Sequence, residues 1–184
     1  ELEAISRAMI VSHHGPKPIL VADIGAETTD LSIVVGGSIR LTGSLPVGGQ
    51  QFTEAIAAAF GVEPAKASET KIRYGLGDSG PAEKVRGALT PLIEQITTEI
   101  RRMLRFYQDR TPGGGSVSEV ILSGGSSTLV GLREYVSEAL GLPVQIGNPW
   151  ENIAVGPEKP TSQISAPIYT TAVGLALGGL DGDY

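Results

Sequence analysis

The sequence has no cysteine and only two histidines, and this excludes several chemistries at once. Without cysteine the chain can form no disulfide, no thiolate zinc site and no cysteine nucleophile, which fits a reducing compartment. The histidines, His13 and His14, are neighbours without a third ligand close by in the sequence, so we interpret them as loop residues. With both histidines in one loop, a Ser/His/acid catalytic triad is not indicated either.

Long apolar runs and an excess of positive charge are also missing. The longest uncharged apolar stretches, residues 18–22 and 170–180, fall short of the roughly 18 to 20 residues that a membrane span needs. Fourteen Lys and Arg against 20 Asp and Glu give a net charge of −6, so we expect no sequence-independent binding of nucleic acid. The chain starts with Glu1 and no basic-then-apolar leader follows, which predicts no secretory signal and a start inside a longer protein.

Glycine, in contrast, is abundant, and it separates apolar segments that have the spacing of strands. Residues 18–22 form a short, branched apolar run that predicts a strand buried on both faces. Alternating apolar residues on either side of Gly36-Gly37 predict a hairpin, because this pair supplies the positive φ that a two-residue turn requires. Short connections leave no room for a parallel crossover, so these three strands are expected to be antiparallel neighbours.

Helical spacing appears first in three short segments, residues 1–11, 52–59 and 65–74. The strongest helical pattern is a series of apolar residues separated by three or four positions, namely Val85, Leu89, Leu92, Ile96, Ile100, Met103 and Tyr107. Pro91 lies inside this pattern, so we expect a break or a kink near residue 90.

The second half of the chain reads as alternating strands and helices. Residues 120–122 predict a buried strand that runs directly into residues 123–128, where we expect a helix to start and to continue to Leu140. A strand at 144–146 and an Ala/Gly-rich helix at 167–177 follow. An antiparallel start followed by βαβ units predicts a mixed α/β sheet, and the helices at 64–75 and 81–109 have room for a small lobe of their own.

Two turns at the ends of predicted strands have the composition of ligand-binding loops. Residues 23–30, Asp-Ile-Gly-Ala-Glu-Thr-Thr-Asp, combine a glycine, two hydroxyls for a phosphate, and Asp23 and Asp30, which can hold Mg²⁺ through water. Ser123-Gly-Gly-Ser126 offers backbone amides next to an expected helix N-terminus. Taken singly, the first fits an ordinary β-turn equally well, and the second fits a simple βα turn better. Together they occupy the carboxyl ends of strands, where open α/β sheets bind ligands.

These motifs resemble a known superfamily. Residues 23–30 are similar to the second phosphate motif of the actin-like ATPases, which include actin, Hsp70, sugar kinases and the division protein FtsA. Residues 122–127 resemble the adenosine motif of that superfamily, and residues 169–176 its second connecting helix. Within the superfamily, further stretches look most like the PilM family of type IV pilus assembly proteins, namely residues 1–8, 44–53, 71–75 and 148–150.

The resemblance extends over essentially the whole chain and implies a fold and a domain organisation. The fold is a ribonuclease-H-like mixed α/β sheet, subdomain 2A, with a small helical insertion, subdomain 2B. The implied boundaries are a leading helix and linker at 1–17, the first part of 2A at 18–61, 2B at 62–115 and the second part of 2A at 116–184. The superfamily's first phosphate loop and first connecting helix are missing, so the chain resembles the C-terminal half of a PilM-like protein.

The resemblance also implies an ATP site with Mg²⁺. The residues carried over to nucleotide binding are Asp23, Gly25, Thr28, Thr29, Lys71, Gly124, Gly125 and Ser126. In this interpretation Asp23 organises the metal, the residues of the first turn contact the β- and γ-phosphates, and the residues of the second turn pack on the adenosine. Lys71 approaches the nucleoside from the opposite side.

Two departures from the family's pattern weaken the expected site. The family has an acidic residue three positions before Lys71, where this chain has Ser68, with Glu69 next to it. Glu27 replaces a glycine of the phosphate loop and adds a negative side chain close to the expected phosphates. We therefore expect weak or slow use of nucleotide, and no efficient ATPase activity from one lobe alone.

The function implied by the resemblance is that of an ATP-binding lobe in type IV pilus biogenesis. In the family, the protein is cytoplasmic, is held at the inner membrane through its partners, and binds the cytoplasmic tail of PilN mostly through the half that is missing here. Other proteins of the pilus assembly platform are further expected partners. The alternatives are a nucleotide-independent scaffold, which includes self-association of such lobes, and a relative of FtsA or of the cytoplasmic domain of the type II secretion protein GspL.

Two surface features remain open at this stage. Arg101, Arg102, Arg105 and Arg110 could face an anionic partner or a membrane surface, but charges on the outer face of a long helix more often contact only solvent. Trp150 either anchors a protein contact or folds over the sheet edge.

Overall fold

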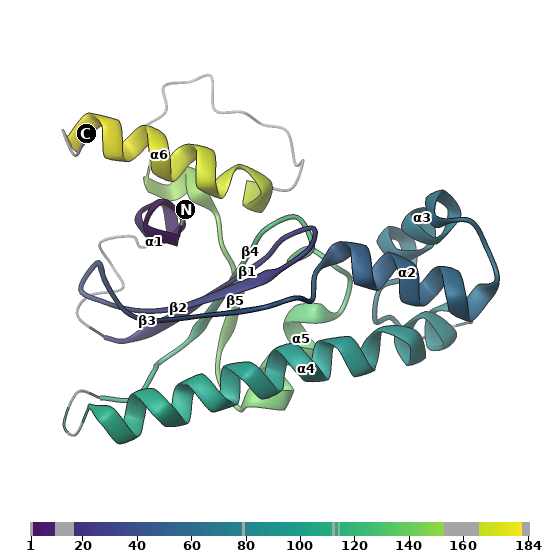
Figure 1. Cartoon of the computed structure of the whole chain (residues 1–184), viewed down its shortest axis with the longest axis horizontal. Coiled ribbons are helices and arrows are strands. Elements are labelled where there is room, and N and C mark those ends of the chain that lie inside the picture. Colours follow the sequence, from purple (N-terminus) through teal and green to yellow (C-terminus); the bar gives the residue numbers. More distant parts are fainter. Residues whose placement is uncertain are drawn as a thin grey trace.

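A five-stranded sheet with the strand order β3-β2-β1-β4-β5 lies at the centre of the computed structural model (Figure 1). The structure describes residues 2–9, 17–78, 80–111, 113, 115–152 and 166–181, so the pair His13-His14 lies outside the described residues. The strands are β1 (Ile19–Ile24), β2 (Thr29–Val35), β3 (Ser38–Leu45), β4 (Val120–Ser123) and β5 (Val144–Ile146).

The pairing of the strands follows from the lengths of their connections. β1, β2 and β3 pair antiparallel, whereas β4 pairs parallel to both β1 and β5. Gly36 and Gly37, with φ angles of 55° and 79°, form the tight turn between β2 and β3. The predicted mixed sheet and its hairpin are therefore confirmed.

Helices cover both faces of the sheet (Figure 1). They are α1 (Leu2–Met9), α2 (Gly49–Phe60), α3 (Pro64–Tyr74), α4 (Pro81–Arg110), α5 (Leu132–Leu140) and α6 (Thr170–Asp181), with two short 3₁₀ turns, η2 (Pro149–Asn152) and η3 (Ala166–Tyr169). α4 and α5 lie on one face, and α1 and α6 lie on the other (Figure 1). α2, α3 and the first part of α4 extend beyond the end of the sheet (Figure 1). No helix among the described residues is both long and apolar enough to cross a membrane.

Helix α4 runs without interruption through Pro91, so the predicted break is wrong. A proline ring collides with the carbonyl group four residues earlier, and here that residue is Gly87. Both residues are exposed, so water can bind the carbonyl of Gly87, which Pro91 leaves without its helical hydrogen-bond donor. The apolar residues of α4 face inward as their spacing predicts, and Leu89, Ile96 and Ile100 are fully buried.

Helix α5 begins at Leu132, after the residues 123–128 in which the sequence predicts its start, and this corrects a second prediction. The residues in between form turns, and Gly131 precedes the helix with a φ of 77°, a left-handed conformation that an α-helix cannot contain. The Gly124-Gly125 pair is therefore a turn and does not form a helix N-terminus. The last helix also differs slightly, because residues 166–169 form a 3₁₀ turn before α6.

The two faces of the sheet form separate hydrophobic clusters. The larger cluster joins β-strand residues such as Leu20 and Leu122 to Phe52 of α2, Ala67 of α3 and Leu89 of α4. Since the expected insertion shares this core with the sheet, the division into subdomains 2A and 2B stays a prediction.

The smaller cluster lies between the sheet and the pair α1 and α6. Gly174 of α6 passes so close to α1 that a Cβ atom there would lie 1.7 Å from the carbonyl oxygen of Ala4. Trp150 packs against this cluster, and its ring centroid is 5.9 Å from that of Tyr169. Of the two alternatives for Trp150, the structure supports folding onto the protein's own core.

Candidate functional site

A cavity of about 450 Å³ opens where the β1–β2 turn, the turn after β4, the start of α2 and helix α3 meet. Its lining consists of Gly25, Ala26, Gly49, Gln50, Phe52, Thr53, Ser68, Lys71, Ile72, Gly125, Ser126, Thr128 and Leu129. A volume of this size is typical of a small-molecule site. The lining combines an apolar wall with a lysine and several exposed backbone groups.

Backbone hydrogen bonds hold the loops of the cavity together. The amides of Gly49 and Gln50 donate to the carbonyl groups of Gly25 and Ala26, at 2.9 Å and 2.8 Å. The amide of Ser126 donates to the carbonyl of Ile24 at 3.1 Å. The two turns and the start of α2 therefore form one unit whose geometry is set by main-chain atoms.

Glycine is required at two positions of this unit. Gly124 has a φ of 82°, and a Cβ atom there would lie 2.5 Å from the carbonyl oxygen of Ile24. A Cβ atom on Gly49 would lie 2.6 Å from Oγ of Ser126. The close approach of the turn after β4 to the end of β1 and to the start of α2 depends on these missing side chains.

Two backbone amides at the mouth of the cavity remain available to a ligand. Ala26 and Gly125 are exposed, and within the described part of the chain their N–H groups have no hydrogen-bond acceptor. Exposed amides in adjacent turns can donate to the oxygens of an anion. By contrast, the first amides of α2 are already used inside the protein, so this helix start offers no free donors at Gly49 or Gln50.

Lys71 brings a positive charge to the cavity wall. Its Nζ atom donates to the carbonyl oxygen of Gly49 at 2.7 Å and to Oγ1 of Thr53 at 2.8 Å. Burial lowers the pKa of Lys71 below its ordinary value. No carboxylate among the described residues forms an ion pair with this lysine. A half-buried ammonium group without a counter-ion favours an anionic ligand.

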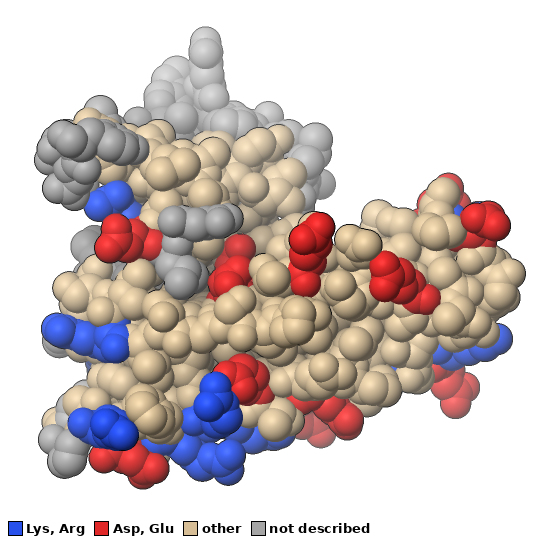
Figure 2. Space-filling view, viewed as in Figure 1, with Lys and Arg blue, Asp and Glu red and all other residues tan. Residues whose placement is uncertain are grey.

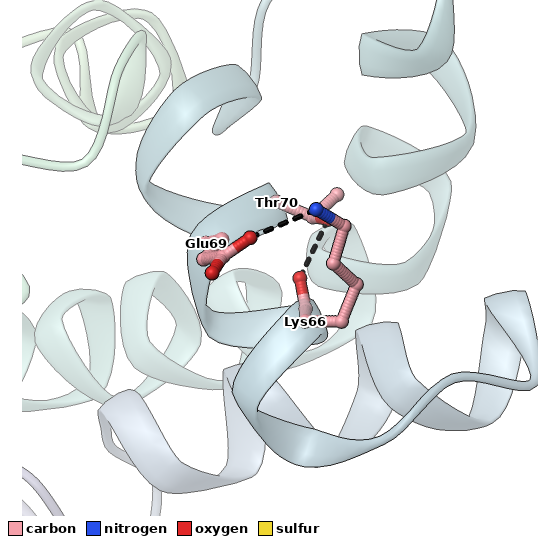
Figure 3. Close-up of polar contacts among 3 residues, drawn as sticks. All are labelled: Lys66, Glu69 and Thr70. Atoms are coloured by element: carbon pink, nitrogen blue, oxygen red, sulfur yellow. Dashed lines mark hydrogen bonds and ion pairs between the residues drawn. The ribbon is translucent and has the colours of Figure 1, made fainter.

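The residues that precede Lys71 on α3 divide between the cavity and the surface. Ser68 lines the cavity. Glu69 is exposed and accepts a hydrogen bond from Nζ of Lys66 at 2.8 Å, while Oγ1 of Thr70 donates to the carbonyl of Lys66 (Figure 3). The hydrogen bond and the charge of Lys66 lower the pKa of Glu69. Glu69 is thus engaged outside the cavity and does not substitute for the acidic residue that the family has near the lysine.

Of the residues predicted to bind nucleotide, Gly25, Lys71, Gly125 and Ser126 line the cavity together. Gly124 lies directly behind them, against the carbonyl of Ile24.

The remaining predicted residues lie away from the cavity lining. The hydroxyl of Thr29 is buried and donates to the carbonyl of Val47 at 2.7 Å, so it serves the protein interior. Oγ1 of Thr28 donates to Oδ2 of Asp30 at 3.0 Å. Asp23 and Asp30 are partners in the antiparallel ladder, which puts their side chains on the same face of the sheet. Among the described residues no group of three or more His, Cys, Asp or Glu could hold a metal ion, so these two could hold one only with water as additional ligands.

The predicted nucleotide-binding set lacks four cavity residues from α2, namely Gly49, Gln50, Phe52 and Thr53. The available signal was the pair Gly48-Gly49 directly before the helix. A Cβ atom on Gly48 would lie 2.7 Å from the carbonyl oxygen of Ala26, so this glycine also permits the loop contact.

Comparison with known proteins gives consistent results. The family model for the type IV pilus assembly protein PilM matches residues 3–180. A solved PilM-PilN type IV pilus biogenesis complex is 33% identical, with a TM-score of 0.77, and the match covers 97% of this chain and 49% of that chain. The cell division protein FtsA of Pseudomonas aeruginosa is 32% identical over 185 residues, which cover 88% of this chain and 42% of that protein.

More distant structures share the fold. MreB 5 of Spiroplasma citri, solved with bound AMPPNP, has a TM-score of 0.73 at 17% identity and covers 98% of this chain and 58% of that chain. The chain spans about half the length of the relatives that it matches.

The resemblance inferred from the motifs is therefore confirmed, as is the actin-like fold. Because the family match runs over nearly the whole chain, the chain belongs to the family of the type IV pilus assembly protein PilM.

Proposed function

We propose that this chain is the ATP-binding lobe of a PilM-type protein and that the cavity beside Lys71 is its share of the nucleotide site. The observation that carries the proposal is the convergence of two glycine-containing turns and an uncompensated lysine on one cavity of about 450 Å³. MreB 5 of Spiroplasma citri, which has the same fold, was solved with AMPPNP and with ADP, and this supports a nucleotide as the ligand.

The lining divides into parts that suit the parts of a nucleotide. The exposed amides of Ala26 and Gly125 can donate to phosphate oxygens, and the Lys71 ammonium favours the negative charge of the ligand. Ile72 and Leu129 give the lining accessible apolar surface against which a base can pack. Mg²⁺ would neutralise charge on the phosphates, held through water by Asp23 and Asp30 on the same face of the sheet.

We expect the chain to bind nucleotide weakly and to hydrolyse it slowly at most. In our proposal this chain supplies one of the two lobes around the nucleotide, and efficient phosphoryl transfer needs a site closed against water with charge stabilisation from all sides. Glu27, exposed in the first turn, adds negative charge near the proposed phosphates.

In the cell, we infer a role on the cytoplasmic side of the inner membrane, within the type IV pilus assembly platform. The family match supports the pilus, and the solved PilM-PilN complex supports a PilN tail as the partner of the whole protein. Other platform proteins remain proposed partners, and attachment to the membrane would be indirect, through these proteins.

The test is isothermal titration of Mg·ATP into this chain and into a longer protein that adds the missing N-terminal lobe. We expect weak or undetectable binding to the chain and clear binding to the longer protein. Gly125→Asp should abolish binding by placing a carboxylate at the cavity mouth, and Asp23→Ala should weaken binding only when Mg²⁺ is present. Gly87→Ala on the outer face of α4 is the matched control. Undiminished binding to the Gly125→Asp protein would show that the site lies elsewhere.

A nucleotide-independent scaffold, self-associating or bound to partners, is the second candidate. Ser68 in place of an acidic residue and Glu27 in the first turn favour it. The scaffold role would be supported if the longer protein binds a PilN tail peptide with equal affinity in the wild type and in the Gly125→Asp variant. Because FtsA of Pseudomonas aeruginosa is 32% identical, a division role is tested by copurification, in which recovery of pilus-platform proteins distinguishes the two systems.

A further inference from the structure

A second hollow, of about 390 Å³, lies between the β2–β3 hairpin and the C-terminal part of α4. Val35, Leu41 and Tyr107 form its apolar lining together with Phe106, and Arg40 and Arg110 border it. We call it the hairpin groove. It shares no lining residue with the cavity beside Lys71, so the two are separate sites.

The two arginines of the hairpin groove are not engaged by the protein's own carboxylates. In the described part of the chain, neither Arg40 nor Arg110 forms an ion pair or a hydrogen bond, although both are exposed. The guanidinium of Arg110 instead stacks over the ring of Phe106, 5.0 Å from its centroid. Elsewhere on α4, Arg102 pairs with Glu99 and Arg101 donates to the carbonyl of Ala139.

Several Lys and Arg side chains gather over this end of the molecule, where the hairpin and the C-terminal part of α4 lie (Figure 2). The chain as a whole carries a net charge of −6, so this concentration runs against the average charge of the protein. Asp109, next to Arg110, is the nearest acidic neighbour in sequence, is exposed, and forms no ion pair with either arginine of the groove. The field at the groove therefore favours an anionic partner.

The groove also exposes apolar surface and the edge of a strand. Phe106 is 46% exposed, so part of its ring is accessible to a partner. β3 is the last strand on its side of the sheet, so its outer backbone groups have no strand partner among the described residues. The β2–β3 ladder shifts register between Ile33 and Val34, which leaves Arg40 without a partner residue on β2, and both Arg40 and Leu41 line the groove.

We propose that the hairpin groove binds an extended, acidic segment of a partner protein. Backbone groups of the segment pair with the outer edge of β3, two carboxylates contact Arg40 and Arg110, and an apolar side chain packs on Phe106. Guanidinium groups bind carboxylates in a bidentate geometry, and an exposed strand edge is a common template for a peptide. A membrane surface is the weaker fit because a lipid headgroup has no backbone donors for the strand edge and the apolar lining is recessed in a groove.

In the experiment, binding peptides are selected from a random dodecapeptide display library. The targets are the whole 184-residue chain and its Arg40→Glu/Arg110→Glu double variant. We expect peptides from the wild-type selection to be rich in Asp and Glu around an apolar residue, and to bind the double variant at least tenfold more weakly (about 1.4 kcal/mol or more). Arg105→Glu is the control for each single reversal, because it makes the same change as Arg110→Glu on the same helix but outside the groove, and it should leave binding nearly unchanged.

Two further measurements make the result decisive. Phe106→Ala should weaken the selected peptides without a change in net charge, and bound peptide should slow hydrogen exchange of the β3 amides. Arg40→Gln with Arg110→Gln removes the charges without reversing them, and thermal unfolding shows that each variant is folded. A library that yields no acidic enrichment, or peptides that bind all variants equally, overturns the proposal. Phosphatidylglycerol vesicles give the other outcome that overturns the proposal. If they bind the wild type but not the double variant, and no selected peptide competes with them, the groove binds a membrane.

Discussion

The two helical layers pack on the sheet in different ways. On one face, α4 fills the space with large side chains such as Leu89, Ile96 and Ile100, all fully buried. On the other face, α1 and α6 approach each other through backbone, with Gly174 against Ala4. The layer with α4 tolerates an irregularity such as Pro91, whereas the contact between α1 and α6 requires that Gly174 has no Cβ atom. Burial of large side chains and close backbone contact are thus two separate ways of holding helices to one sheet.

The largest effect is expected in the layer of large side chains. Leu89→Ala removes a fully buried side chain from the larger cluster and should lower the free energy of unfolding by about 2–5 kcal/mol. Urea denaturation followed by circular dichroism measures it. Leu92→Ala, on the same helix but only partly buried, is the control and should cost clearly less. Equal losses would mean that burial does not distinguish the two positions.

The close backbone contact should respond to a single methyl group. Gly174→Ala places a Cβ atom 1.7 Å from the backbone oxygen of Ala4, which cannot move away cheaply, so we expect a loss of about 1–3 kcal/mol. Gly178→Ala makes the same change on the same helix, but its new atom meets the end of the Arg7 side chain and not backbone, so it should cost less than Gly174→Ala. Thermal unfolding of both proteins compares them. A Gly174→Ala protein as stable as the wild type would refute the close approach.

Two buried hydroxyls on β2, those of Thr29 and Ser32, allow the two sides of the sheet to be compared within one strand. Oγ of Ser32 is buried on the side of α1 and α6 and has no hydrogen-bond partner among the described residues, so Ser32→Ala should stabilise the protein by about 1 kcal/mol. Thr29→Val removes a hydroxyl that donates to the carbonyl of Val47 and should destabilise it by about 1–3 kcal/mol. Denaturant midpoints measure the change in stability of both variants. A change of the same sign in both would contradict the different hydrogen bonding of the two hydroxyls.

The smallest effect concerns Lys71, whose folded-state pKa is lowered by burial from the ordinary value of 10.5. Between the two pKa values the unfolded chain binds more protons than the folded one, so the charged lysine costs stability at neutral pH and this cost disappears as the pH rises. The stability of the wild type relative to Lys71→Met should therefore increase with pH up to about 10.5. Nucleotide affinity should fall over the same range, but not in Lys71→Arg, which keeps its charge. If the stability difference between the wild type and Lys71→Met does not change with pH, burial does not lower the pKa of Lys71 and the prediction is wrong.

Features that depend on local spacing could be predicted from the sequence. The register of apolar residues specifies the buried face of α4, and Gly36-Gly37 specifies the hairpin, because both patterns act through neighbours along the chain. Two predictions were wrong: α4 has no break at Pro91, and α5 starts later than predicted. In the first case Pro91 lies on the exposed side of α4, where water can bind the carbonyl that it leaves unpaired, and in the second the left-handed Gly131 delays the helix, so each outcome depends on a local circumstance that the general rule does not weigh.

The candidate site was predictable only in part, for a related reason. Gly25 and Gly125 belong to turns at strand ends, which a motif can identify. Gln50 and Thr53 enter the cavity because the start of α2 bonds to the first turn, a contact between loops that no local pattern encodes. The hydroxyl of Thr29 fits a phosphate motif in sequence, yet the strand turns it into the protein interior.

The contact between α1 and α6 also has a consequence for the order of events on the ribosome. About 160 residues separate the two helices, so at 5 to 20 residues per second α6 is synthesised roughly 10 to 30 seconds after α1. During that interval the apolar side of α1, with Ile5 and Met9, lacks the helix that covers it in the finished protein. Over this period α1 offers an apolar segment that a chaperone can recognise. The sheet and α4 can fold earlier, and α1 is secured only when the last helix arrives.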